Sequence, residues 1–63
     1  MNNELEEYIL NNMNIINESN LSASTRMYLS NTINKIIYKY RQHIIEYKIL
    51  VIQINTLIEK YCK

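Results

Sequence analysis

Two polar side chains, Ser30 and Asn34, interrupt an apolar helical pattern in the middle of the chain. Residues four apart lie on one face of a helix, one turn from each other, so both side chains could reach the same pocket. Asn34 carries an amide, which accepts a hydrogen bond from water but cannot serve as a general base. From packing alone, Ser30 is a small residue where helices approach closely, and Asn34 is a solvated amide. The chemistry open to this pair is therefore binding, or the positioning of a water molecule.

The composition excludes several classes of function. The chain has 63 residues, a formal net charge of +1, one cysteine and one histidine. A chain of this size forms at most one small domain, residues 1–63, which is too short for a cofactor fold. Cys62 and His43 alone cannot build a structural zinc site, so we expect no metal ligands and no cofactor of the protein's own. The near-neutral charge argues against nucleic-acid binding.

Two further features bear on the location of the protein. No apolar run is long enough to span a membrane, so we expect no membrane association. The single thiol and the lack of a signal-peptide pattern at the N-terminus lead us to expect a cytoplasmic protein.

The elements that must position the polar pair are expected to be helices. The chain contains no glycine and no proline, the residues that most often interrupt helices. The first helix is expected at about 3–17, followed by a turn at 17–22 that is rich in Asn and Ser. The second helix is expected at about 23–60, with Ser22 or Ser24 as its N-cap. The predicted fold class is all-α, an antiparallel two-helix hairpin with a long second helix.

A heptad repeat runs through the expected second helix. Apolar residues also occupy the neighbouring g positions, so the stripe is wide enough to contact more than one partner helix. The shorter first helix can cover only half of this stripe. We therefore expect a homodimer through the C-terminal heptads, because a soluble protein normally hides a large apolar patch in an interface. The alternative is a break near residues 41–43 that folds the tail back as a third helix. The a positions are Ser30, Ile37, Ile44, Val51 and Ile58, and the d positions are Ile33, Tyr40, Tyr47, Ile54 and Tyr61.

Residues 21–40 resemble the stage-zero sporulation protein E-like aspartyl-phosphate phosphatases, which are small bacterial proteins built as an antiparallel two-helix hairpin. The family pattern in the second helix is Ser-Gln-x-Leu-Asp-x-Leu-Ile-x-x-Tyr. Ser30, Ile37 and Tyr40 match it outright, and isoleucine replaces both leucines. Asn31 and Asn34 stand in for the Gln and the Asp. The corresponding stretch reads Ser30-Asn31-Thr32-Ile33-Asn34-Lys35-Ile36-Ile37-Tyr38-Lys39-Tyr40.

The resemblance implies a target, the phosphorylated receiver domain of the sporulation response regulator. Hydrolysis of its aspartyl phosphate requires a positioned water, while the receiver supplies Mg²⁺ and most of the charge stabilisation. Because Asn34 replaces the motif Asp, the catalytic role left to it is positioning that water. Binding would involve Ser30, Asn31, Asn34 and Lys35. The expected function is a small negative regulator of a sporulation phosphorelay with weak or lost phosphatase activity, and whether it is an enzyme stays open.

Other classes of function are also compatible with the sequence. The main alternative is a structural coiled-coil interaction module with no catalytic role, whose apolar seam binds another helix. A DNA-associated helical fragment is a further idea, because residues 24–29 faintly resemble the helical arm-binding domain of phage-type recombinases. The net charge of +1 argues against this idea.

Overall fold

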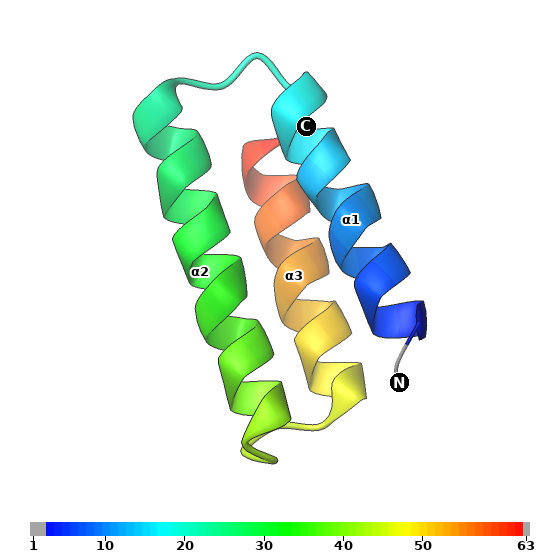
Figure 1. Cartoon of the computed structure of the whole chain (residues 1–63). Helices are drawn as coiled ribbons and strands as arrows, with labels where there is room; N and C mark the ends of the chain where they lie inside the picture. Colours follow the sequence, from blue (N-terminus) through cyan, green and yellow to red (C-terminus); the bar gives the residue numbers. More distant parts are fainter. Residues whose placement is uncertain (1–2, 63) are drawn as a thin grey trace.

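The structure is a computed structural model that describes residues 3–62. It forms an elongated bundle of 32 × 19 × 16 Å in which consecutive helices run antiparallel (Figure 1). Within the described range every regular element is a helix, which confirms the all-α prediction. The favoured prediction had two helices, and the described residues form three. Helix α1 spans Asn3–Glu18, α2 spans Ala23–Arg41 and α3 spans Tyr47–Tyr61.

The first turn, between α1 and α2, lies where the sequence predicts it. Ser22 is the N-cap of α2, and its hydroxyl oxygen accepts a hydrogen bond from the backbone N–H of Thr25 at 3.2 Å. This bond satisfies one of the backbone donors that the first turn of a helix leaves unpaired. Of the two serines considered for this position, Ser22 is therefore the one that caps the helix.

The second turn, between α2 and α3, divides the helix predicted at 23–60 into two. The prediction of a two-helix hairpin is therefore wrong, and the alternative of a third helix is the one found. Helix α2 ends in a Schellman motif, in which the N–H of Ile44 donates to the carbonyl of Lys39 at 2.8 Å. The N–H of His43 donates to the carbonyl of Tyr40 at 3.0 Å. His43 is the left-handed residue of this motif, with φ of 61°. The chain then reverses, and α3 begins beside α2.

The cause of this break is difficult to see in the sequence. Glycine is the usual left-handed residue at the end of a helix, and the chain has none. Histidine adopts this conformation more readily than most residues with a Cβ, so it can take the place of glycine. The rings of Tyr40 and Tyr47 meet edge to face across the turn, with their centroids 5.7 Å apart. Such a ring contact stabilises the reversal beyond the area that it buries.

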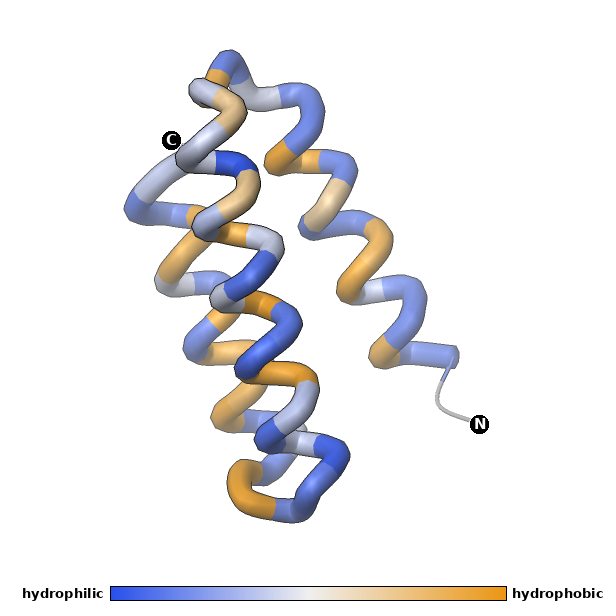
Figure 2. The backbone as a smooth tube through the Cα atoms, turned by 60° about the vertical axis from the view of Figure 1, so that its left-hand side comes forward, coloured by the Kyte–Doolittle hydropathy of each residue, from blue (hydrophilic) through white to orange (hydrophobic). Residues whose placement is uncertain are grey.

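The core lies between the three helices. Leu29 and Ile33 of α2 pack with Leu50 and Ile54 of α3, and each of these side chains is at most 1% exposed. Figure 2 shows α2 and α3 close together, with α1 to one side of this pair. The wide apolar stripe thus contacts two helices, as predicted, but both belong to the same chain. The buried hydrophobic residues are Leu5, Ile16, Leu29, Ile33, Ile36, Ile37, Leu50, Ile54 and Ile58.

The packing of α3 against α2 removes the reason for expecting a dimer through the C-terminal heptads, which was an exposed apolar patch. The expected patch is not formed, because two of its residues, Ile54 and Ile58, are buried within the chain. Ile44, expected at an a position of the dimer seam, lies in the turn and is 65% exposed. The g positions Leu29 and Leu50 are fully buried instead. A homodimer remains a prediction without this support.

Candidate functional site

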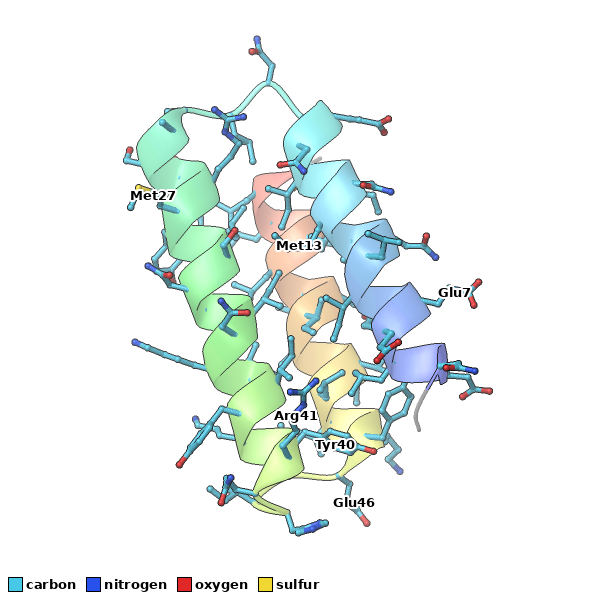
Figure 3. The ribbon with its side chains drawn as sticks, in the orientation of Figure 1. Glu7, Met13, Met27, Tyr40, Arg41 and Glu46 are labelled. Atoms are coloured by element: carbon cyan, nitrogen blue, oxygen red, sulfur yellow. The ribbon has the colours of Figure 1, made fainter. Side chains whose placement is uncertain are left out.

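The residues that carry the sequence motif lie along one side of α2. Successive residues of a helix are rotated by about 100°, so Ser30, Asn34 and Tyr38 follow one another along a single face. Ser30 is half-buried, and the other two are exposed. Met27 and Asn31 complete this surface, and both are exposed. In Figure 3 the side chain of Met27 projects away from the bundle, whereas Met13 of α1 lies between the helices. We call Met27, Ser30, Asn31, Asn34 and Tyr38 the motif face.

A shallow hollow between α1 and α2 includes two of the motif residues. Ser30 and Asn31 line it from α2 together with Arg26, and Asn17 lines it from the last turn of α1. Its volume is about 350 Å³. The hollow therefore places a hydroxyl, two amides and a guanidinium next to one another. Such a set can donate several hydrogen bonds to an anionic or carbonyl-rich surface.

Asn34 and Lys35 lie outside this hollow. Asn34 is on the same face one turn further along α2, and it is exposed to solvent. Lys35 lies about 100° further round the helix and lines a different groove, between α2 and α3. The structure thus brings Ser30, Asn31 and Asn34 onto one face, and Lys35 lies one turn from Asn31 at the edge of this face, beside the groove between α2 and α3. The suggested water-positioning role of Asn34 stays a prediction.

Charges are segregated between the first two helices. Helix α1 contains Glu4, Glu6, Glu7 and Glu18 and no lysine or arginine. Helix α2 contains Arg26, Lys35, Lys39 and Arg41 and no Asp or Glu. The acidic residues in the first turn of α1 and the basic residues in the last turn of α2 complement the helix dipoles, whereas Glu18 and Arg26 lie at the opposite ends of their helices. In Figure 3 the carboxylate of Glu7 points outward from α1, on the side away from α2. Helix α2 therefore offers a cationic surface with no carboxylate of its own.

A polar network joins α1 to α3, and the sequence patterns did not predict it. The Tyr8 hydroxyl lies 2.5 Å from Oδ1 of Asn55 and 3.2 Å from the carbonyl oxygen of Val51. Burial raises the pKa of Tyr8, with Asn12 opposing this shift and Tyr47 adding to it. Asn12 is buried, and its amide donates to the carbonyl of Tyr8 at 2.8 Å. These polar groups fix the position of α1 on the bundle, and they do not form part of the motif face.

Three further features of the described residues concern metal binding, membrane crossing and the single thiol. Residues 3–62 contain no cluster of three or more His, Cys, Asp or Glu side chains able to hold a metal ion. Over the same range no helix combines the length and apolarity needed to cross a bilayer. Cys62 is a free, half-buried thiol.

No protein-family model, curated protein or solved structure matches this chain. The resemblance to the sporulation phosphatases therefore rests on the motif residues alone and stays a prediction.

Proposed function

We propose that the protein is a cytoplasmic regulator that binds the receiver domain of a response regulator through the motif face of α2, without hydrolysing its phosphate. The observation that carries this proposal is the location of Ser30, Asn31 and Asn34 on one face of a helix without carboxylates. A phosphorylated receiver presents acidic side chains and a phosphoryl group. A cationic helix with projecting hydroxyl and amide groups complements such a surface.

The anchoring of α2 supports a role in recognition. Its buried face packs through Leu29, Ile33 and Ile37, and each of these side chains is at most 9% exposed. The motif residues are therefore held on a supported helix and need little ordering when a partner binds. A site on such an element loses less conformational entropy on binding than a site on a flexible loop.

The exposure of Asn34 favours binding over catalysis. A water that attacks a phosphoryl group must be held in line by a positioned acceptor, and an amide can provide only the hydrogen bond. Asn34 is exposed, so a water molecule that it holds is open to bulk solvent on this protein. The receiver would have to supply the rest of the site. The protein then acts by occupying the surface that other partners of the receiver need.

The test uses the phosphorylated receiver domain of a sporulation response regulator. Calorimetry measures its binding to the protein, while phosphate release is followed in the same mixture. We expect binding with an unchanged rate of release. The double variant Asn31→Ala with Asn34→Ala should weaken binding about tenfold, because it removes two exposed amides without disturbing the core.

The chain provides a matched control for this experiment. Asn11 and Asn14 have the same spacing on α1, and both are exposed. Their double substitution by alanine should leave binding unchanged. Equal weakening by the two pairs would contradict the proposed face, and so would a failure to bind at about 1 mM receiver. Faster phosphate release that Asn34→Ala abolishes would show a phosphatase and overturn the non-catalytic proposal.

A further inference from the structure

A second surface lies next to the motif face, further round α2. It is a groove of about 420 Å³ between α2 and α3. We call it the α2–α3 groove. Its floor is apolar, because Ile36 is buried, Leu57 is half-buried, and Ile52 is 53% exposed along its edge. The residues that line it include Lys35, Ile36 and Lys39 of α2 and Ile52, Gln53 and Leu57 of α3.

The two charged residues that line this groove have one sign. Lys35 and Lys39, one helical turn apart, line its α2 side, and the residues that line it in the described structure include no carboxylate. On α3, Glu59 and Lys60 both lie about one turn beyond Thr56, another lining residue, and the ammonium of Lys60 is 5.5 Å from the centre of the Tyr61 ring. The Tyr61 ring in turn contacts Tyr28 of α2, with centroids 5.8 Å apart. An apolar floor with a cationic rim is complementary to an amphipathic helix that has acidic flanks.

A second copy of this chain does not fit the groove well. The acidic helix α1 would be the natural occupant, but it lies on the other side of α2. Ser30, which faces the hollow shared with α1, and Thr32, which lines the groove, are about 200° apart around the helix. In a two-fold dimer, therefore, the α1 helix of each copy cannot lie in the groove of the other. Head-to-tail docking of α1 into the groove would give an open chain of copies and not a closed assembly. Contact between two grooves would bring lysines of like charge together.

We propose that the α2–α3 groove binds an acidic amphipathic helix of a partner protein. Apolar side chains of that helix pack on Ile36, Ile52 and Leu57, and its carboxylates face Lys35 and Lys39. The groove adjoins the motif face, because Lys35 lies one helical turn from Asn31. The inference does not depend on the identity of the receiver.

The test uses two synthetic amphipathic peptides of about 18 residues, which as helices are close in length to α2 with its 19 residues. Both carry the same leucine stripe, and their polar faces are rich in glutamate in one and lysine in the other. Fluorescence anisotropy of the labelled peptides measures binding to the whole protein. We expect the glutamate peptide to bind at least about tenfold more tightly than the lysine peptide.

Matched variants show whether the groove is the site. Lys35→Glu with Lys39→Glu should reduce binding of the glutamate peptide by at least about tenfold. The control Arg26→Glu with Arg41→Glu changes the same number of charges on the same helix, outside the groove, and should have a much smaller effect. Ile52→Gln should also weaken binding, whereas Ile44→Gln, at an exposed isoleucine in the turn, should not. Circular dichroism verifies that each variant keeps its helices.

Several outcomes would overturn this inference. Equal affinity for the two peptides would show that charge does not select the occupant. Equal losses in the lysine and arginine pairs would indicate a diffuse electrostatic attraction without a groove. The absence of binding up to about 1 mM peptide would also contradict it. So would binding to anionic lipid vesicles alone, because that result would assign the cationic surface to a membrane.

Discussion

The hydroxyl of Tyr8 lies 2.5 Å from Oδ1 of Asn55 and joins two helices whose contacting residues are 47 positions apart in the chain. This is one of the few direct polar links between α1 and α3 among the hydrogen bonds of the described structure. The remaining contacts of α1 with the bundle are largely apolar. The position of the first helix thus depends on a single tyrosine more than on any other polar side chain.

Replacement of this tyrosine by phenylalanine should lower the free energy of unfolding. Tyr8→Phe removes the bonds to Asn55 and Val51 while leaving the ring in place, and a hydrogen bond of this kind contributes about 0.5–1.5 kcal/mol. Urea unfolding of the two proteins measures the difference. Tyr38→Phe is the matched control, because Tyr38 is 62% exposed and its change should stay within about 0.5 kcal/mol. Equal effects of the two substitutions would contradict the link.

The same residue should make stability depend on alkaline pH. The pKa of Tyr8 is raised above 10.0 in the folded protein, mainly by burial, so the folded state retains the proton that the unfolded state releases. Stability from this group is complete below the unfolded pKa and is lost as pH rises through the folded pKa.

Comparison with the phenylalanine variant isolates this contribution. The other tyrosines and lysines titrate in both proteins, so the difference in unfolding free energy between wild type and Tyr8→Phe should shrink from about pH 9 to about pH 11. Urea unfolding at the two pH values measures it. A difference that stays constant or grows over this range would contradict the raised pKa.

Substitution of His43 by glycine should change the stability in opposite directions in the three-helix bundle and in a fold with one continuous helix over 23–60. His43 has a positive φ, which costs a residue with a Cβ about 1 kcal/mol. His43→Gly should therefore stabilise the three-helix bundle by up to about 1 kcal/mol. In a continuous helix over 23–60 the same change would destabilise by about that amount, since glycine is a poor helix former.

The comparison variant is Lys35→Gly, in the interior of α2. It should destabilise the protein, because that position is helical in either fold. Thermal unfolding of the two variants beside wild type provides the measurement. Destabilisation by both glycines would indicate that the second helix continues through residues 42–46.

A pair of core and turn substitutions separates the bundle from the heptad dimer. Leu50→Ala should cost about 2–4 kcal/mol, because Leu50 is fully buried between the helices. Ile44→Ala should cost less than about 0.5 kcal/mol, because this side chain lies exposed in the turn. In a dimer with Ile44 at an a position the second substitution would also be costly, and unfolding would depend on protein concentration. Urea unfolding at two protein concentrations tests both points.

The sequence predicts the helices better than it predicts their number. The capping serine at Ser22 and the regular apolar spacing are local signals, so the start of α2 and its buried residues follow from them. The end of α2 after Arg41 is not marked by a glycine or a proline, the residues that usually signal a helix end. It depends on His43 accepting a left-handed conformation and on the ring contact between Tyr40 and Tyr47, which exists only in the folded chain.

The same limit applies to the candidate site. Ser30, Asn31 and Asn34 fall on one face because helical spacing alone decides it. Lys35 follows Asn34 in the sequence, yet it lines the groove between α2 and α3 because one residue turns the helix by about 100°. The α2–α3 groove needs α3 beside α2, so it follows only from the alternative of a third helix and not from the two-helix hairpin that the sequence favoured.

The most direct test of the role of α2 is an amide chemical-shift map of the labelled protein during titration with the phosphorylated receiver domain. The largest changes should fall on the motif face, between Met27 and Tyr38, and the outward residues of α1 such as Asn11 and Asn14 should be unaffected. Changes centred on α1, or no changes at receiver concentrations near 1 mM, would contradict α2 as the recognition helix.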